Sequence, residues 1–352
     1  MSKRVKTITV NDKKIGPGRP VYIIAEAGVN HNGDLALAEK MIKVAADCGA
    51  DAIKFQAYKS ELLASPGAPL AQYQKKTVKS SRTQRTMLKS FELAPDDFKR
   101  LQKKCQDSHI EFLASPFDLE SLQMLLDLGV SAVKIASPEL TDTPLLEAVA
   151  KSRVPALVST GAATLPEIKS ALAVLQSGKL SDIALFHCVS SYPAPYEFAN
   201  LRAIVTMRDA FLLPVGYSDH SPGLHIAVAA VGMGALLLEK HFTLDRTLPG
   251  PDQALSINPS ELHSFVTAVR QVEKALGSGV KEPQEIELNV RESARKSIVA
   301  VRAVKKGEKF TRDMLTTKRP ATGLAPDMLR KVVGRRAKCD IPADAIITKD
   351  MI

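Results

Sequence analysis

Long apolar runs are missing from this chain of 352 residues, although 45% of its residues are hydrophobic and can form a large core. The longest runs fall far short of the roughly 20 residues that a membrane-spanning helix needs. The opening Met-Ser-Lys-Arg-Val-Lys-Thr also lacks the apolar centre of a signal peptide. We therefore expect a cytoplasmic protein that does not associate with membranes.

Cysteine is also scarce, since the chain has only four, at Cys48, Cys105, Cys188 and Cys339. These residues are far apart, and none belongs to a Cys-x-x-Cys pair. The spacing indicates neither a zinc ribbon nor a disulfide framework. Reduced thiols are expected.

Acidic residues are few near the C-terminus. Residues 295–352 hold 15 Lys and Arg against 6 Asp and Glu, whereas the rest of the chain is nearly neutral, with 33 against 32. A basic segment could bind nucleic acid, cover an anionic substrate or form a solvated surface. Phe310 is its only aromatic residue and offers little for base stacking, so we predict no nucleic-acid partner.

Short apolar runs alternate with helical patterns through most of the chain. Eight runs predict buried strands, and apolar residues at spacings of three and four predict helices between them. Such alternation favours a parallel sheet, and eight units close a (β/α)₈ TIM barrel. The predicted strands are 21–26, 51–56, 111–114, 132–136, 155–159, 183–188, 214–217 and 235–240, and the clearest helices are 35–45, 120–128, 144–151, 166–176 and 260–276.

The chain is longer than the about 250 residues of a single barrel. Gly-Ser-Gly-Val-Lys-Glu-Pro at 277–283 is typical of a linker, and short strand patterns with turns follow it. We predict a barrel over 1–280, a linker over 281–294 and a small β-rich domain over 295–352. The connection at 57–94 is unusually long and basic, which is typical of a lid, but we assign its lysines and arginines no catalytic role.

Polar residues follow the predicted strands at their C-terminal ends, which form the active-site face of a TIM barrel. His220 and His241 end consecutive strands, so their imidazoles could converge as a partial metal site. Water and substrate oxygens would have to complete the coordination.

Two lysines, Lys54 and Lys134, lie within predicted strands, where some side chains must point inward. A lysine in a barrel interior needs an anionic partner or a perturbed pKa. The partner could be a buried carboxylate, or both lysines could hold a bound phosphate or carboxylate with the help of hydroxyls. The candidate carboxylates are Glu26, Glu139 and Glu239, and the candidate hydroxyls are Ser115, Ser137, Ser159 and Ser218.

An ordered set of segments resembles the sialic acid synthase family, which condenses phosphoenolpyruvate with an N-acylated amino sugar. The resemblance covers nearly the whole chain, and its tail at 297–308 and 318–320 resembles the antifreeze-like (SAF) module of such synthases. The matching segments are 25–33, 53–56, 134–139, 159–161, 187–193, 216–220, 239–243 and 250–252.

The resemblance implies a role for each matching position. His220 and His241 would ligate a divalent metal, manganese in the first place, with magnesium or cobalt as alternatives. Arg319 would reach the N-acyl group from the partner subunit, which implies a domain-swapped homodimer. Phosphoenolpyruvate would be held by Lys54, Ser115, Lys134, Ser137, Ser159, Ser190 and Ser218, and the sugar by Gln56, Glu139, Tyr192 and Asp252.

The implied reaction is metal-assisted carbon–carbon bond formation with C–O cleavage, for which Glu139, Lys54 and Lys134 are the catalytic candidates. The sugar would be N-acetylmannosamine or 2,4-diacetamido-2,4,6-trideoxymannose, and His-Cys-Val-Ser-Ser-Tyr-Pro at 187–193 favours the second. Two other classes stay open. One is a Schiff-base aldolase that uses either lysine, and the other is a non-catalytic protein that binds nucleic acid or carbohydrate.

Overall fold

The structure is a computed structural model that describes residues 5–77 and 81–352. Lys79, one of the basic residues of the 57–94 connection, lies outside the described residues. The chain divides into two compact units, one up to Gly277 and one from Ser278, and each is described by itself. None of the described helices is long and apolar enough to cross a membrane.

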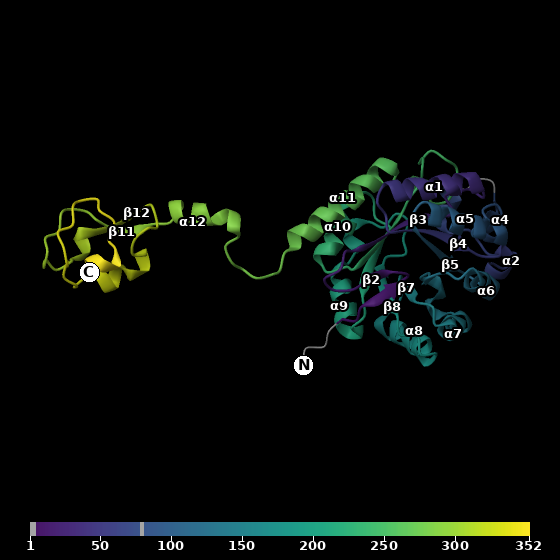
Figure 1. Ribbon diagram of the computed structural model, residues 1–352. Coiled ribbons are helices and arrows are strands. Elements are labelled where there is room, and N and C mark those ends of the chain that lie inside the picture. Colours follow the sequence, from purple (N-terminus) through teal and green to yellow (C-terminus); the bar gives the residue numbers. More distant parts are fainter. Residues whose placement is uncertain (1–4, 78–80) are drawn as a thin grey trace. The chain divides into compact units, whose positions relative to one another are not determined.

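The first unit is a closed barrel of eight parallel strands inside a ring of helices (Figure 1). Neighbouring strands follow the chain order, and the last strand pairs with the first through the register Leu237 to Tyr22. The predicted TIM barrel is confirmed. Its strands are β3 (Tyr22–Gly28), β4 (Ala52–Ala57), β5 (Glu111–Pro116), β6 (Val133–Ile135), β7 (Ala156–Ser159), β8 (Ile183–Cys188), β9 (Val215–Asp219) and β10 (Leu237–His241).

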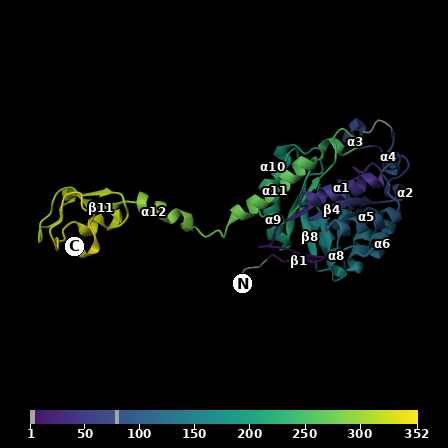
Figure 2. The ribbon, with the colours of Figure 1, turned by 45° about the horizontal axis from the view of Figure 1, so that its top comes forward.

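The helices around the barrel begin at capping residues that the sequence supplies. Asp34 accepts hydrogen bonds from two amides in the first turn of α1, and Asn258 with Glu261 forms a capping box for α11. Apolar faces of these helices cover the outside of the strands, as α1, α5 and α6 do in Figure 2. The helices are α1 (Leu35–Asp47), α5 (Pro95–Asp107), α6 (Leu119–Asp127), α7 (Thr143–Ser152), α8 (Leu165–Ser177), α9 (Arg202–Phe211), α10 (His225–Gly232) and α11 (Pro259–Leu276), with 3₁₀ turns η1 (Pro138–Thr141), η2 (Tyr196–Phe198) and η3 (Gln253–Leu255).

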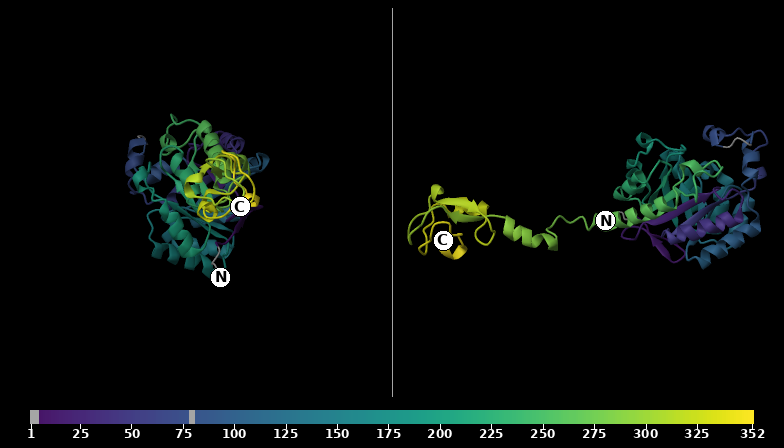
Figure 3. Two further views of the ribbon diagram at one scale, coloured as in Figure 1. Left: turned by 90° about the vertical axis from the view of Figure 1, so that its left-hand side faces the viewer. Right: turned by 90° about the horizontal axis from the view of Figure 1, so that it is seen from above.

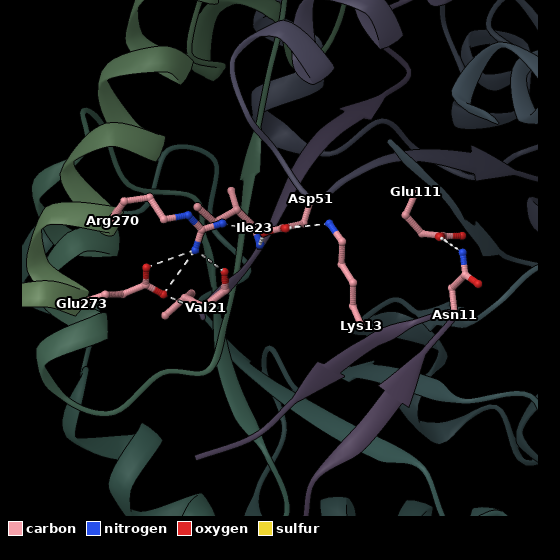
Figure 4. A network of polar contacts seen from close by, with 8 residues as sticks. All are labelled: Asn11, Lys13, Val21, Ile23, Asp51, Glu111, Arg270 and Glu273. Atoms are coloured by element: carbon pink, nitrogen blue, oxygen red, sulfur yellow. Dashed lines mark hydrogen bonds and ion pairs between the residues drawn. The ribbon is translucent and has the colours of Figure 1, made fainter. Parts of the chain in front are cut away.

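A hairpin of β1 (Ile8–Val10) and β2 (Lys13–Ile15) covers the end of the barrel where the strands begin. The sequence did not predict it. Its apolar side chains pack on the first residues of the barrel strands, and its polar side chains bond to Asp51 and Glu111 (Figure 4). Asp51 also accepts bonds from the guanidinium of Arg270 on α11, at 2.8 Å, and from the amide of Ile23, at 2.9 Å. The far end of the barrel is thereby closed.

The described part of the long connection after β4 contains three short helices, α2 (Ser60–Leu63), α3 (Gln72–Thr77) and α4 (Gln84–Lys89). Apolar residues of this connection, among them Met87 and Leu88, pack with Val29 and Phe117 as a separate small core. The connection is therefore a folded flap with its own core.

The second unit has a core of its own and a short antiparallel sheet, formed by β11 (Ser297–Ala300) and β12 (Leu315–Lys318) and drawn in yellow-green in Figure 3. Phe310 and Val332 are among its fully buried residues. The segment predicted as a linker at 281–294 contains a helix, α12, and the amide of Ala321 donates to the carbonyl of Glu292 in it. The remaining elements are η4 (Glu285–Glu287), α12 (Leu288–Ala294), η5 (Arg312–Met314), η6 (Pro326–Met328), α13 (Leu329–Val332) and η7 (Lys349–Met351).

Candidate active site

A cavity of about 480 Å³ lies at the C-terminal ends of the barrel strands. Every site residue that the sequence predicted in the barrel lines it, and the lining comes from all eight strands or the segments that follow them. Arg319 is exposed on the second unit. The predicted residues that line the cavity are Lys54, Gln56, Ser115, Lys134, Ser137, Glu139, Ser159, Ser190, Tyr192, Ser218, His220, His241 and Asp252.

Two buried lysines and two buried glutamates form a charged group in the floor of this cavity. Lys54 Nζ lies 2.7 Å from Glu26 Oε2 and 3.9 Å from Glu239 Oε2, and Lys134 Nζ lies 3.5 Å from Glu239 Oε1. Burial alone would raise the pKa of Glu239, but the charges of Lys134 and Lys54 lower it. A buried carboxylate partner and a bound anion were the two expectations for these lysines. They are compatible, because both lysines pair with carboxylates and also face the cavity.

Serine hydroxyls surround this charged group. Lys54 donates to Ser115 Oγ at 3.2 Å, Lys134 donates to Ser159 Oγ at 2.6 Å, and Ser218 donates to Glu239 at 2.9 Å. Each serine comes from a different strand, so the barrel gathers them around one point. Ammonium groups and hydroxyls that converge in this way can bind a polyanion.

Two further hydroxyls, those of Ser137 and Ser190, pack closely against Gly161. Its amide donates to Ser137 Oγ at 2.9 Å. A β-carbon at this position would lie 2.2 Å from Ser190 Oγ and 2.8 Å from Ser137 Oγ, which is closer than atoms approach in proteins. Only glycine leaves room for both hydroxyls in these positions, and both serines line the cavity.

The two histidines lie side by side at the edge of the cavity, with ring centroids 5.5 Å apart. His220 Nδ1 is 2.8 Å from the carbonyl oxygen of Val189, so it donates to that oxygen and leaves Nε2 as the unprotonated atom. Burial lowers the pKa of both imidazoles, and for His241 the charges of His220 and Lys54 lower it further. Both rings are therefore neutral near pH 7, which is the form that binds metals.

These histidines fit a divalent cation with an open coordination sphere. Nδ1 of His241 is buried without a hydrogen-bond partner, and the tautomer of His220 leaves a lone pair available. No group of three or more His, Cys, Asp or Glu in the described part of the chain forms a complete metal site. Two protein ligands leave the other positions to water and substrate oxygens.

Two carboxyl groups on the remaining sides of the cavity have strongly raised pKa values. Burial raises the pKa of Glu139 to about 7, and burial with the negative charge of Glu26 raises that of Asp252 to about 7. One oxygen of each carboxyl is buried without a hydrogen-bond partner. Both groups can therefore exchange protons near neutral pH with a ligand in the cavity.

The sequence treated Glu26 and Glu239 only as ion-pair partners, and it assigned Gly161 no role of its own. The structure places both glutamates in the cavity lining. The sequence did contain a signal for each glutamate, because each interrupts an apolar run. Glu26 lies in β3 and Glu239 in β10, and both strands are buried along their whole length. Gly161 could not be found in this way, because its importance comes from the approach of two separate loops.

The comparisons with known proteins agree with this architecture. The model of the NeuB family matches residues 41–281, and the model of the SAF domain matches residues 295–352. A solved structure of an N-acetylneuraminic acid (sialic acid) synthetase from Leptospira borgpetersenii, in complex with citrate, has a TM-score of 0.73 and 41% identity. The match covers 82% of this chain and 96% of that chain.

Curated relatives are similar over nearly their full length. The N,N'-diacetyllegionaminic acid synthase of Campylobacter jejuni is 45% identical, over 94% of this chain and 99% of the relative. The human N-acetylneuraminate-9-phosphate synthase is 34% identical, over 96% of this chain and 94% of the relative. The resemblance stated from the sequence is confirmed, and the alternative of a non-catalytic binding protein is not supported. The chain belongs to the NeuB family and is an enzyme of the nonulosonic acid synthase type, with a SAF domain in its C-terminal unit.

Proposed function

We propose that this enzyme condenses phosphoenolpyruvate with an N-acylated mannose-type amino sugar, giving a nonulosonic acid and phosphate. One observation carries the proposal. A buried cluster of two lysines and several hydroxyls shares a single cavity with two neutral histidines and two carboxyls of raised pKa. These groups supply anion binding, metal ligation and proton transfer, which the reaction needs together.

Phosphoenolpyruvate binds at the lysines in this proposal. Its phosphate and carboxylate accept hydrogen bonds from the ammonium groups of Lys54 and Lys134. The surrounding hydroxyls are those of Ser115, Ser159 and Ser218. Ser137 and Ser190, which pack against Gly161 and line the cavity, supply two further hydroxyls to the anion. The enol ester is then held with its C3 carbon toward the histidine edge.

Manganese is the proposed cation, held by His220 and His241, with magnesium or cobalt as substitutes. When bound, it supplies Lewis-acid polarisation of the aldehyde oxygen of the open-chain sugar. C3 of phosphoenolpyruvate forms a bond to the aldehyde carbon, and water adds at C2 as positive charge develops there. The tetrahedral intermediate then loses phosphate by cleavage of its C–O bond. Glu139 is the proposed proton acceptor for the attacking water, since its pKa of about 7 leaves it partly ionised at neutral pH.

The sugar occupies the side of the cavity that the flap covers. Gln56, Tyr192 and Asp252 provide polar contacts there, but the wall formed by the flap and the adjoining barrel residues is mostly apolar. A hydroxyl against such a wall loses hydrogen bonds with water, at a cost of about 1–3 kcal/mol. We therefore propose a deoxygenated diacetamido sugar, 2,4-diacetamido-2,4,6-trideoxymannose, over N-acetylmannosamine. The apolar residues of this wall are Leu63, Met87, Leu88 and Phe91 of the flap with Val29 and Phe117 of the barrel, and the flap also contributes Gln74 and Gln84.

A domain-swapped homodimer completes the proposal, with the partner subunit's Arg319 reaching the N-acyl group of the sugar. Exposed apolar side chains at two places support the proposal that a partner subunit covers this surface. Tyr196 and Phe198 are exposed in the segment after β8, on the cavity face of the barrel. Ile286 and Leu288, which precede the SAF domain, are exposed as well.

Mixing two inactive variants tests the swap. His220→Ala loses the metal site and Arg319→Ala loses the arginine. If the arginine acts from the partner, a heterodimer has one complete site, and random exchange restores about a quarter of wild-type activity. If Arg319 acts within its own chain, mixing restores none, and the domain swap is wrong.

Release of phosphate from phosphoenolpyruvate, with manganese, tests the reaction itself. The panel of sugars contains N-acetylmannosamine, 2,4-diacetamido-2,4,6-trideoxymannose and a 6-deoxy analogue with one acetamido group. We expect sugar-dependent release, with the diacetamido sugar preferred by about 10-fold or more in kcat/KM. Absence of release with every sugar would refute the proposed function.

A Schiff-base aldolase is the second candidate, and one observation favours it. Burial lowers the pKa of Lys134, as an amine nucleophile requires. Incubation with pyruvate and borohydride discriminates the two chemistries. A covalent adduct at Lys134 indicates the aldolase, whereas manganese-dependent release of phosphate without an adduct indicates the synthase.

A further inference from the structure

A buried ion pair lies behind the two histidines, on the opposite side of the strands from the cavity. Lys240 Nζ is 2.6 Å from Asp219 Oδ2, and these side chains are only 3% and 0% exposed. Neither residue lines the cavity, whereas their neighbours His220 and His241 do. This follows from strand geometry, because consecutive side chains of a strand point to opposite faces.

The contacts of Lys240 bracket His220. Its ammonium also donates to the carbonyl of Ser221 at 2.9 Å, so it holds the residues on both sides of that histidine. Asp219 Oδ1 accepts from the amide and the hydroxyl of Ser221, at 2.9 and 2.6 Å. Lys240 itself directly precedes His241, and it pairs with Asp219 in the register of β10 and β9. One buried network therefore joins the backbone positions of both histidines.

Stability alone is a poor reason for such a network. Burying two charges carries a large desolvation penalty, and buried ion pairs can often be replaced by neutral residues without loss of stability. Fixing the relative position of two groups is the better-supported use of a buried polar network. Here the two groups are imidazoles whose ring centroids lie 5.5 Å apart, close enough to share one ligand.

We propose that Asp219, Lys240 and Ser221 form a positioning clamp that presets the geometry of the His220 and His241 metal site. The inference rests on the proposed function, since it requires these histidines to bind a divalent cation. Residues outside the ligand shell that orient ligands in this way typically contribute 10- to 100-fold to metal affinity, by the general behaviour of such sites. The clamp acts through the backbone between the strands, whereas the carbonyl of Val189 orients the ring of His220.

The principal test is the double variant Asp219→Asn/Lys240→Met, which removes both charges and keeps the side-chain sizes. Methionine cannot donate across the strands, whereas asparagine keeps an acceptor for Ser221. Binding of Mn²⁺ alone is measured by titration with electron paramagnetic resonance of the free ion. We expect a folded protein whose Kd for Mn²⁺ is raised about 10- to 100-fold.

Two further measurements separate positioning from general damage. Asp51→Asn/Arg270→Met is the matched control, because it removes a charge pair at the opposite end of the barrel, and its Kd for Mn²⁺ should equal that of the wild type. The affinity for phosphoenolpyruvate without metal should be unchanged in the clamp variant, since both cavity lysines lie on other strands. A folded clamp variant with wild-type Mn²⁺ affinity overturns the inference, and so does an equal loss of Mn²⁺ binding in the control.

A milder variant keeps the inference testable if the double variant does not fold. Ser221→Ala removes one hydroxyl bond to Asp219 and leaves the ion pair, and we expect about a threefold or larger rise in Kd for Mn²⁺. An unchanged Kd overturns the clamp. His220→Ala serves as the reference for an abolished site. If the wild type binds Mn²⁺ no better than His220→Ala, the metal in the proposed function is itself wrong. If the wild type binds Mn²⁺ tightly and the folded clamp variants bind it equally tightly, only the clamp is refuted.

Discussion

Replacing Gly161 with alanine tests the anion site most directly. The new β-carbon would lie 2.2 Å from Ser190 Oγ and 2.8 Å from Ser137 Oγ, so at least one hydroxyl must move from its position. A hydrogen bond to a charged ligand contributes about 1.5–3 kcal/mol, and the loss of one such bond raises Kd about 10- to 150-fold. We expect this rise for phosphoenolpyruvate, measured by calorimetry, and no change in the affinity for Mn²⁺.

Gly232→Ala is the matched control for this substitution. A β-carbon at Gly232, the last residue of α10, meets no atom within 4 Å, so the same chemical change should leave ligand affinity at the wild-type value. Circular dichroism and the thermal midpoint establish that both variants are folded. A folded Gly161→Ala protein that binds phosphoenolpyruvate as tightly as the wild type would refute the assignment of the Ser137 and Ser190 hydroxyls to the anion.

Three other expectations concern stability, pH and metal. Because burial raises the folded-state pKa of Glu139 from 4.5 to about 7, its stabilising contribution is complete below pH 4.5 and is lost as the pH rises through 7. We therefore compare the free energy of unfolding in urea of Glu139→Gln and the wild type at two pH values. Between pH 4.5 and pH 8 the difference should shift in favour of the variant by up to about 3 kcal/mol. The same difference at both pH values would contradict this pKa. Arg270→Met should lower the free energy of unfolding by about 1–3 kcal/mol, since it removes hydrogen bonds to Asp51 and Val21. Its kcat should be unchanged, and a lower kcat in the folded variant would show that this end of the barrel affects the site. Chelation with EDTA should abolish phosphate release and added manganese should restore it, except in His241→Ala, and activity that persists in EDTA would exclude the metal role.

The barrel could be predicted from the sequence because burial on both faces makes each strand a nearly continuous apolar run. The same reasoning failed for the hairpin of β1 and β2. Its strands have three residues each, and Lys13 and Lys14 stand where alternation alone gives little signal. The helices of the flap were missed for a related reason, since α2 has four residues and its order depends on packing against Val29 and Phe117.

The lysines, the histidines and the serines that end the strands could be predicted from the sequence pattern, because strand ends in a barrel converge on one face whatever the detailed register. Gln56, Ser190, Tyr192, Asp252 and Arg319 were proposed only from the family resemblance. The partners of the site residues could not be predicted. Whether Lys54 contacts Glu26 or Glu139 depends on strand neighbours and side-chain reach, and the structure pairs it with Glu26. The network of Asp219 and Lys240 was hidden for the same reason, because it requires the register between β9 and β10.

Closure of the barrel between β3 and β10 has a consequence for synthesis of the chain. Nδ2 of Asn30, just after β3, donates to the carbonyl of Phe242, 212 residues later. At the usual speed of translation of about 5–20 residues per second, about 10 to 40 s separate the two residues on the ribosome. The lysine strands β4 and β6 emerge early, whereas the histidine strands β9 and β10 come last. The nascent chain therefore contains both cavity lysines before Glu239, which lies near both, has been synthesised, and the two imidazoles meet only when the last strand closes the barrel.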